Sequence, residues 1–411
     1  MLLAARAVMD RGHDVLVLSD GCNVSDAAAE GVPFGAWTTA PSRTDRSPQT
    51  DPLKDWEART PLEVIQHLID GVMCGPAARY AADTVAAIEA FQPDVVVSHE
   101  LLFGVMAGAK ARGRRLALFA ANVWSLPTLP DAPPFGAGLP PPKTPFDYEF
   151  YGKVARATAE AFRYGLDPLN AVRARLGLAP LAEFFEQLKA ADRILIATSR
   201  AFDFDQALPE PYRYVGPYLA DPAWTEDWSP PWGADRRPLV LISFSTMYQN
   251  QEPVLRRAIE ALGRLQVQGV VTLGPQLAPA DFPAPDNVVV TGRAPHSRIL
   301  PLASAVITHA GHASALRPLM AGAPLVCVPL GRDQADNAAR VTGAGAGIRL
   351  PADASTHDIE AAVKAVLDEP SYRAHARALG ARIAADVAAR SADAELIDLA
   401  DDQPQLKELR R

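Results

Sequence analysis

Residues 308–337 carry the pattern that decides the fold, in two motifs: Thr308-His309-Ala310-Gly311-His312-Ala313-Ser314 and Gly331-Arg332-Asp333-Gln334-Ala335-Asp336-Asn337. The β-branched run at 305–308 is typical of a buried parallel strand, and helical sequence follows it. A helix start binds anions through free backbone N–H groups, and Gly311 leaves room for a diphosphate. Asp333 and Gln334 follow the next predicted strand, 325–329. A carboxylate beside an amide can bind the hydroxyls of a sugar.

Strand-like and helix-like runs alternate along the whole chain, which predicts α/β structure of the doubly wound kind. We expect strands at 15–18, 95–98, 116–119, 194–197 and 239–243, and helices at 77–90 and 372–389. The Pro-rich residues 127–145 predict a loop, and residues 343–347 predict a helix end with a turn. Residues 219–238, with four prolines and three tryptophans, predict an ordered linker.

These runs divide the chain into two α/β domains. We expect the first at 1–218, the second at 219–385, and a helix end with a polar, frayed tail at 386–411. A length of 411 residues allows two to three domains, each with its own core.

Composition excludes several classes of protein. A net charge of −8 gives no basic surface for nucleic acid, and a hydrophobic content of 48% argues against disorder. Three scattered cysteines fit a reducing cytosol better than a disulfide framework or metal cluster. The opening apolar run stops at Asp10 and Arg11, too short for a membrane span. We therefore expect a cytoplasmic protein with no transmembrane segment and no nucleic-acid partner.

The two motifs, taken together, resemble those of nucleotide-sugar-dependent glycosyltransferases of the macrolide and natural-product type, glycosyltransferase family one. Weaker matches at 11–15, 93–97, 214–217 and 243–246 extend the resemblance over most of the chain. It implies the GT-B fold, in which two Rossmann-like domains face each other across a cleft. The second domain then binds a UDP- or dTDP-sugar without metal or cofactor, and the first binds a hydrophobic small-molecule acceptor.

The resemblance also assigns roles to donor-site residues. The diphosphate falls to His309, Gly311 and Ser314, the donor sugar to Asp333 and Gln334, and the loop facing the donor to Ser245 and Thr246. Each of Asp333 and Ser314 has a purely structural alternative, as a helix cap and as a first-turn residue.

Two positions depart from the family at the nucleotide. Arg293 stands where relatives place an aromatic residue against the base, and a guanidinium can also stack there. Arg317 stands where several relatives have a glutamate for the ribose hydroxyls. Pro318, which lacks an N–H, predicts a kink or irregular turn in the same helix. The choice between UDP and dTDP stays open.

The general base is the largest departure. Family members begin with a strand and a Gly-His loop whose histidine, oriented by an aspartate, deprotonates the acceptor. Aligned through Arg11-Gly12-His13, that loop and the first strand would precede Met1. His99-Glu100 stands in the place of the aspartate, after the predicted strand 95–98. His99 is therefore the candidate substitute base, and its alternative is an ordinary solvated histidine.

The expected function is inverting, metal-independent glycosyl transfer to a hydroxyl of a hydrophobic acceptor. The alternative is a nucleotide-sugar-binding protein with little or no transferase activity, and a GT-B epimerase is a third class. Two further patterns stay ambiguous. The Asp203-Phe204-Asp205 run has the form of a metal-binding Asp-x-Asp but predicts a surface loop. The aromatic residues at 146, 148, 150 and 151 predict either an acceptor pocket or ordinary packing.

Overall fold

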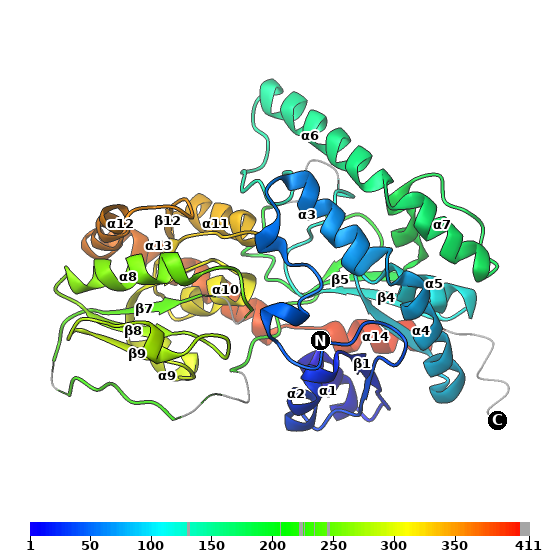
Figure 1. The fold of residues 1–411 in the computed structure, drawn as a ribbon, viewed down its shortest axis with the longest axis horizontal. Coiled ribbons are helices and arrows are strands. Elements are labelled where there is room, and N and C mark those ends of the chain that lie inside the picture. The colour runs from blue at the N-terminus through cyan, green and yellow to red at the C-terminus, as the bar shows by residue number, and fades with distance from the viewer. Residues whose placement is uncertain are drawn as a thin grey trace.

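The computed structural model describes residues 1–129, 132–205, 207–221, 225, 227–233, 235–244 and 247–402. Two α/β domains lie side by side, each built on parallel strands with helices packed against them (Figure 1). This is the arrangement that the alternating pattern of the sequence predicts. Within the described ranges, no helix is both long enough and apolar enough to cross a membrane.

The first domain contains two separate sheets. Strands β1 (Val17–Ser19) and β2 (Phe34–Ala36) form one, and the other has the order β3-β4-β5-β6, from Val95–His99, Arg115–Ala120, Arg193–Ile196 and Tyr212–Tyr214. All pairs are parallel. The helices are α1 (Leu2–Asp10), α2 (Val24–Ala29), α3 (Pro61–Leu68), α4 (Ala77–Phe91), α5 (Phe103–Ala111), α6 (Pro145–Arg163) and α7 (Leu166–Arg175).

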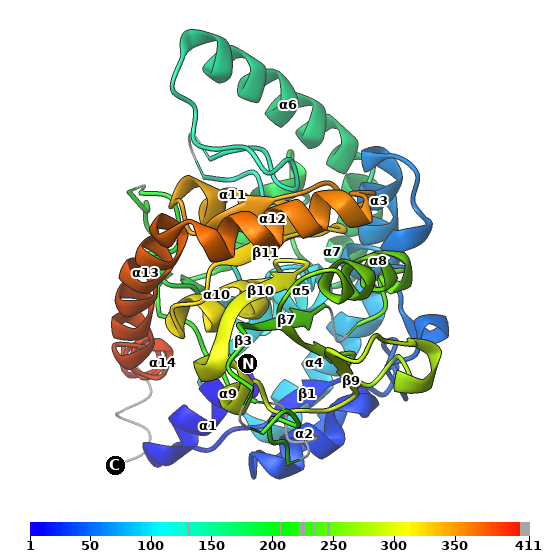
Figure 2. The same cartoon turned by 90° about the vertical axis from the view of Figure 1, so that its left-hand side faces the viewer.

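Helix α6 projects from the body of the molecule in both views (Figures 1 and 2). Its start follows from the sequence. Thr144 and Asp147 form a reciprocal capping box, and Pro145 occupies the first helical position, where its missing N–H costs nothing. The predicted loop therefore ends where the sequence first offers a helix start.

The second domain has one continuous sheet of six parallel strands in the order β12-β11-β10-β7-β8-β9. The strands are β7 (Leu239–Ser243), β8 (Gln268–Thr272), β9 (Val288–Thr291), β10 (Ala303–Thr308), β11 (Leu325–Cys327) and β12 (Gly347–Arg349). The helices are α8 (Glu252–Gly263), α9 (His296–Ile299), α10 (His312–Met320), α11 (Gln334–Gly343), α12 (Thr356–Asp368) and α13 (Pro370–Ala388).

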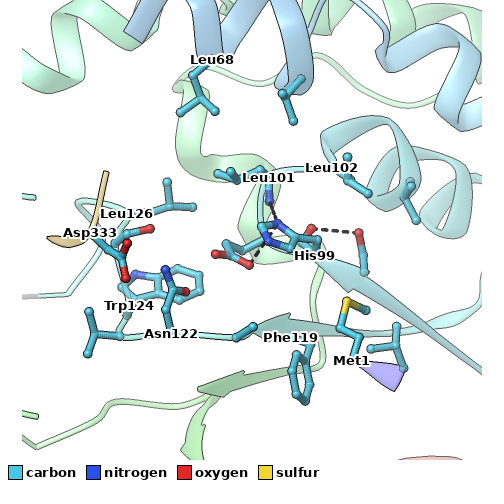
Figure 3. A pocket seen from close by; sticks show the side chains of 18 of the residues that line it. Met1, Leu68, His99, Leu101, Leu102, Phe119, Asn122, Trp124, Leu126 and Asp333 are labelled. Atoms are coloured by element: carbon cyan, nitrogen blue, oxygen red, sulfur yellow. Dashed lines mark hydrogen bonds and ion pairs between the residues drawn. The ribbon is translucent and has the colours of Figure 1, made fainter. Parts of the chain in front are cut away.

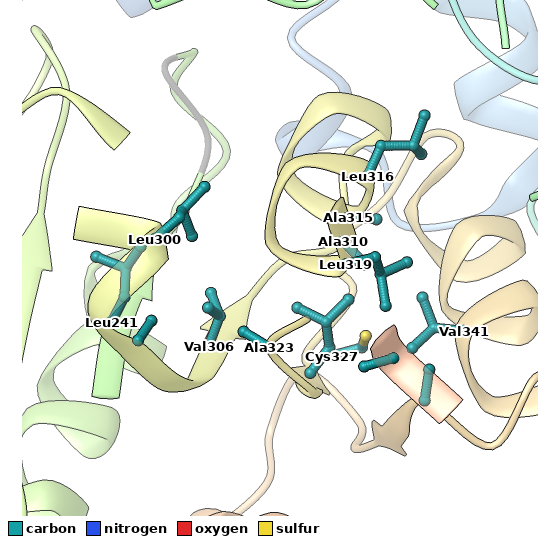
Figure 4. Packing of buried hydrophobic residues seen from close by; sticks show 14 of the residues in the cluster. Leu241, Leu300, Val306, Ala310, Ala315, Leu316, Leu319, Ala323, Cys327 and Val341 are labelled. Atoms are coloured by element: carbon teal, nitrogen blue, oxygen red, sulfur yellow. The ribbon is translucent and has the colours of Figure 1, made fainter. Parts of the chain in front are cut away.

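Hydrophobic residues fill both faces of this sheet. On one face, Leu241, Val306 and Leu319 are buried among side chains from the strands and α10 (Figure 4). Helix α13 packs closely on α10 because Gly380 has no side chain. A Cβ there would lie 1.9 Å from the carbonyl oxygen of Leu319. Close packing of this kind fixes α10, and with it the start of the helix that the first motif provides.

The chain finally returns to the first domain through α14 (Ala392–Asp401). Leu399 is fully buried with Phe119 and Leu195 of the first-domain sheet. Arg11 of the first domain donates to Asp393, with 3.0 Å between Nη1 and Oδ2. The predicted frayed tail from residue 403 onward lies outside the described residues.

Most predicted elements form within one or two residues of the expected bounds. Strand β7 occupies the predicted 239–243, and α4 extends the predicted 77–90 by one residue. Strand β11 ends at Cys327, before the predicted end at 329. Helix α10 continues through Pro318 to Met320, so the helix is not interrupted by the irregular turn that Pro318 predicted. The remaining 3-10 turns are Gly21–Asn23, Pro48–Thr50, Asp55–Glu57, Phe184–Ala190, Pro279–Asp281 and Leu300–Leu302, with a π turn at Ile69–Met73.

Candidate functional site

A cavity of about 2240 Å³ opens in the first domain and reaches the second. It is larger than the roughly 300–1,000 Å³ of a usual small-molecule site. One part runs between β1 and β3, whose facing residues include Val17 and Val97, so these two strands do not pair with each other. The other part is lined from the second domain by residues 331–333, 336 and 340.

The start of α10 stands at the carboxyl end of β10. Gly311 is the N-cap, and no side chain caps the first turn. The three following residues therefore present N–H groups that have no partner within the helix. Ala310 has a positive φ of 64°, which turns the chain sharply from strand to helix. The arrangement supplies the anion-binding helix start that the sequence predicts.

His309 lies against this helix start. A Cβ on Gly311 would lie 2.5 Å from Nε2 of His309, so the ring requires a glycine at that position. The ring of Phe244 stacks on the imidazole, with 6.0 Å between centroids. Burial, reinforced by the charge of Arg332, lowers the pKa of His309 to about 4, so the ring is neutral at pH 7. Among the described residues, nothing bonds to Nδ1 of this buried ring.

The second motif is tied to the first by Asn337. Its Nδ2 donates to the carbonyl oxygen of Ala310 at 3.0 Å and to Oδ2 of Asp333 at 2.8 Å. Asp333 is the N-cap of α11 but makes no side-chain cap bond, so its carboxylate is free to face the cavity that it lines. Burial raises its pKa, and hydrogen bonds from Asn337 and Asn122 oppose that rise.

Gln334 is more enclosed than its predicted role requires. Its Oε1 accepts from the backbone N–H of Leu330 at 2.8 Å, and its Nε2 donates to Oε1 of Gln249 at 2.8 Å. The residue is only 2% exposed. Asp333 lines the cavity, whereas His309, Ser314 and Gln334 are not among its lining residues. Their donor contacts remain predictions.

His99 ends β3 and lines the cavity (Figure 3). Its Nδ1 lies 3.2 Å from Oε2 of Glu100 and 3.3 Å from the backbone N of Leu101. The His99 side chain is 38% exposed, whereas that of Glu100 is 3% exposed. Both interactions engage Nδ1, which leaves Nε2 as the nitrogen available to a substrate.

A loop of the first domain is bound across the cleft by α11. The backbone N–H groups of Gly136 and Gly138 donate to the carboxylate of Asp336 at 2.7 and 2.8 Å. Arg349 donates to the carbonyl oxygen of Gly138 at 2.8 Å. The predicted Pro-rich loop therefore forms a wall of the cavity rather than a free surface segment.

Two arginines of the second domain also make ion pairs with the first domain. Arg332 donates from Nε and Nη2 to the two carboxylate oxygens of Asp55, both at 2.7 Å. Arg340 donates from Nε and Nη2 to Oδ1 of Asp203 at 2.8 and 2.6 Å. The second pair is almost fully buried, with side-chain exposures of 7% and 1%.

The interpretation of Asp203-Phe204-Asp205 as a surface loop was wrong for Asp203. That carboxylate also accepts from the hydroxyl of Tyr214 at 2.9 Å, and Phe204 lies 4.2 Å beneath the guanidinium of Arg340. Asp203 therefore joins the domains. No group of metal-ligating side chains occurs anywhere in the part of the chain that the structure describes.

Of the four aromatic residues at the start of α6, for which the sequence predicted either an acceptor pocket or ordinary packing, only two line the cavity. Tyr148 and Tyr151 line the cavity. Phe146 and Phe150 are exposed and stack on each other, with 6.3 Å between their centroids. The cavity therefore uses only one face of the helix.

The remaining predicted nucleotide residues lie away from the cavity lining. Arg317 makes an ion pair with Asp221 of the linker. Arg293 is exposed after β9. Ser245 and Thr246 lie outside the described residues.

Sequence reasoning missed several residues of the cleft. Asn122, Asp55 and Asp336 bind partners far away in the chain, and only Asp336 lay inside a recognised motif. The position of Asn122 just after β4 was a signal, because the carboxyl ends of parallel strands meet at one edge of a sheet.

Comparison with known proteins places this geometry in a family. The family model for erythromycin biosynthesis protein CIII-like, C-terminal domain, matches residues 256–400. The chain is 33% identical over 334 residues to 4'-demethylrebeccamycin synthase of Lentzea aerocolonigenes, covering 79% of this chain and 77% of that protein. It is 31% identical over 198 residues to oleandomycin glycosyltransferase of Streptomyces antibioticus, covering 47% and 45% of the two chains.

Solved structures agree on the fold. The glycosyltransferase of kitacinnamycin superposes with a TM-score of 0.74 at 21% identity, covering 97% of this chain and 94% of that one. The calicheamicin glycosyltransferase CalG4 gives a TM-score of 0.71 at 19% identity, covering 98% and 95%. The fold is GT-B, as the two motifs predict. The chain belongs to the natural-product glycosyltransferases of glycosyltransferase family one.

Proposed function

We propose that the protein moves a sugar from a nucleoside diphosphate sugar to a hydroxyl of a hydrophobic small-molecule acceptor, with inversion at the anomeric carbon and without a metal ion. One observation carries this proposal. The cavity that His99 lines in the first domain extends to Asp333, and Asn337 links Asp333 to the start of α10. The proposal therefore assigns the base for the acceptor and the site for the leaving group to one cleft.

The second domain stabilises the leaving group in this proposal. The acceptor oxygen forms a bond to the anomeric carbon while the bond from that carbon to the diphosphate oxygen breaks. Negative charge then develops on the diphosphate. In the proposal, the N–H groups at the start of α10 and the ring of His309 bind it, and the helix dipole has the favourable sign.

The first domain supplies the base in this proposal. Nε2 of His99 takes the proton from the acceptor hydroxyl, which requires the tautomer with a proton on Nδ1. Glu100, with Oε2 at 3.2 Å from Nδ1, favours that tautomer and stabilises the imidazolium that forms. In the structure the N–H of Leu101 donates to Nδ1 at 3.3 Å, and Oε2 of Glu100 makes no hydrogen bond to any described residue. The proposal therefore requires the ring to turn when the acceptor binds, so that Nδ1–H donates to Glu100 in place of accepting from Leu101.

Recognition of the nucleotide is also a proposal. We assign the diphosphate to His309, Gly311 and Ser314, and the sugar to Asp333 and Gln334. A solved neighbour, VinC, was crystallised with dTDP and superposes with a TM-score of 0.65. Arg293 then stacks on the base, and either UDP or dTDP fits this assignment.

One observation favours the alternative, a nucleotide-sugar-binding protein with little transfer. The amide of Gln334 is already bonded to the backbone of Leu330 and to Gln249. A sugar hydroxyl must displace or share these bonds. If it does not, the donor binds mainly through its nucleotide, and the sugar is poorly oriented for attack.

A transfer assay separates the two. The protein is incubated in EDTA with UDP-glucose or dTDP-glucose and a panel of phenols and macrolides. We expect transfer, and we expect His99→Ala to slow it by about 10²–10⁴-fold. His357→Ala, on an exposed face of α12, is the matched control and should leave the rate unchanged. Donor binding without transfer to any acceptor would support the alternative, and equal rates for His99→Ala and wild type would place the base elsewhere.

A further inference from the structure

Arg332 is a cation on the second-domain side of the cavity, directly before Asp333. It lines the cavity, and its side chain is 25% exposed. Nε and Nη2 donate to the carboxylate of Asp55, both at 2.7 Å, which occupies one edge of the planar guanidinium. On the other edge, Nη1 donates to the sulfur of Met247 at 3.6 Å. A thioether is a weak acceptor, so an anionic oxygen is a much better partner for this edge.

The backbone at Arg332 is also unusual. Its φ of 57° lies in the left-handed region, which residues with a Cβ rarely adopt. Such a conformation costs free energy, and it is found most often at ligand sites, where the surrounding structure holds it in place. Ala310, in the turn before α10, has a similar φ of 64°. Each of the two motifs therefore contains a left-handed residue in the turn that leads from its strand to its helix.

The charge of Arg332 acts on the predicted donor site. Burial lowers the pKa of His309, and the positive charge of Arg332 lowers it further. Met247 directly follows Ser245 and Thr246, which the family resemblance assigns to the loop facing the donor. The edge of the guanidinium with Nη1 therefore contacts one segment that is predicted to face the donor, and its charge acts on another.

The other arginines that line the cavity, Arg59 and Arg340, are less suited to bind an anion. Arg340 donates from Nε and Nη2 to Asp203, and from Nη1 to the carbonyl oxygen of Asp336 at 3.0 Å, so each of its nitrogens already has an oxygen partner. Arg59 is exposed, on the first-domain segment before α3. Arg332 instead combines a place in the cleft with an N–H group whose acceptor is weak.

Negative charge also surrounds Arg332. The carboxylates of Asp51, Asp55 and Asp333 all act electrostatically on its guanidinium. In the proposed reaction, a nucleoside diphosphate brings further negative charge beside Asp333. Repulsion between like charges is strong in a partly buried cleft, because the effective dielectric is lower there than in water. A cation between the carboxylate and the diphosphate relieves this repulsion.

We propose that Arg332 is a further catalytic residue, whose Nη1 leaves the sulfur of Met247 and donates to an oxygen of the donor diphosphate while Asp55 holds the opposite edge. The proposal rests on the proposed function, because it assigns the diphosphate to the start of α10. When the bond from the anomeric carbon to the diphosphate oxygen breaks, its electron pair stays on that oxygen, and the guanidinium offsets the charge. Asp55 is then a positioning residue that the first domain contributes to the donor site.

The affinity for a nucleoside diphosphate relative to its nucleoside tests this role. UDP is compared with uridine, and dTDP with thymidine, in wild type and Arg332→Gln. Calorimetry in EDTA measures the diphosphates, and NMR titration measures the weaker nucleosides. We expect the preference for the diphosphate to fall by about 10- to 100-fold in Arg332→Gln, because a charge-assisted hydrogen bond is lost. The affinity for the nucleoside should not change. An unchanged preference in Arg332→Gln would overturn the proposal.

Asp55→Asn is the matched control. It breaks the same ion pair between the domains but keeps the cation, so it should retain the preference for the diphosphate. An equal fall in both variants would mean that Arg332 and Asp55 act only as a link between the domains, and would refute the proposal.

A measurement on wild-type protein applies if Arg332→Gln does not fold. Phenylglyoxal modifies arginine side chains, and mass spectrometry follows the peptide that carries Arg332. At a concentration about ten times its Kd, the diphosphate should slow this modification about tenfold, since only the free protein reacts. Equal modification with and without the diphosphate would refute the proposal. If wild type binds neither UDP nor dTDP, the proposed function fails as well. If it binds them without dependence on Arg332, only the role of Arg332 fails.

Discussion

Both domains are built on parallel strands, but only the second has them in one continuous sheet. In the second domain, six parallel strands form a continuous sheet, and every residue of β7 is buried. In the first domain, β1 and β3 lie in separate sheets, and the cavity runs between them. A continuous sheet fixes the helix starts at its carboxyl edge. Fixed helix starts suit a ligand of constant shape, such as a diphosphate.

The polar groups of the two domains differ in the same way. The second domain encloses three neutral histidines, His296, His309 and His312, and burial lowers the pKa of each to about 4. The acceptor side holds Glu100, a carboxyl group whose pKa burial raises. Acidification therefore destabilises the buried histidines and relieves the buried charge of Glu100.

The largest expected effect is loss of stability in the second domain below pH 6.5. Unfolded histidines take up protons near pH 6.5, whereas the folded ones resist until about pH 4. The stabilisation is therefore complete above pH 6.5 and falls as the pH drops through this window. Between pH 7 and pH 5 we expect the free energy of unfolding to fall by about 2 kcal/mol for each histidine. Urea unfolding at the two pH values measures this loss.

Protonation of Glu100, Asp333 and Asp336 opposes this loss, because their raised pKa values mean that neutralisation relieves buried charge. A variant isolates one histidine from the rest. The free energy of unfolding of His312→Asn should depend less on pH than that of wild type, with both proteins measured at each pH. An identical pH dependence in the variant would contradict the assignment of a neutral, buried His312.

The next effect concerns the bond that joins the domains. Asp203→Asn leaves the charge of Arg340 buried without its carboxylate, and we expect a loss of about 3–5 kcal/mol in the free energy of unfolding. Asp393→Asn is the control. It removes the more exposed pair with Arg11, for which the loss should be below about 1 kcal/mol. Equal losses in urea unfolding would mean that the buried pair has no special weight.

A smaller effect compares the two sheets directly. Strands β1 and β2 have three residues each and no fully buried residue, whereas β7 is buried throughout. Hydrogen exchange should therefore be at least about 100-fold faster for the amides of β1 and β2 than for those of β7 and β10. Similar protection in both sheets would show that the cavity does not weaken the first domain.

The sequence predicted the strands of the second domain more completely than those of the first. Residues 239–243 and 305–308 are apolar and β-branched, which indicates buried parallel strands without knowledge of their neighbours. The motif around Gly311 likewise has a local cause, since the strand-to-helix turn and the contact with His309 need a glycine.

Contacts across the cleft were beyond sequence reasoning. Arg332 and Asp55 are 277 residues apart, and Arg340 and Asp203 are 137 apart. No periodicity links such pairs, because they form only when the domains have folded and met. For the same reason a local pattern placed Asp203 on the surface. The pair His99-Glu100 was found from its position after a strand, but its orientation and burial required the structure.

The central claim is a division of labour, in which the second domain holds the donor and the first acts on the acceptor. Calorimetry of UDP and dTDP in EDTA tests it most directly, with wild type, His309→Ala and His99→Ala. We predict that His309→Ala weakens nucleotide binding by about 10-fold or more, because a hydrogen bond to a charged phosphate is lost. His99→Ala should bind the nucleotide as wild type does. Unchanged binding in His309→Ala, or equal weakening in both variants, would contradict the account.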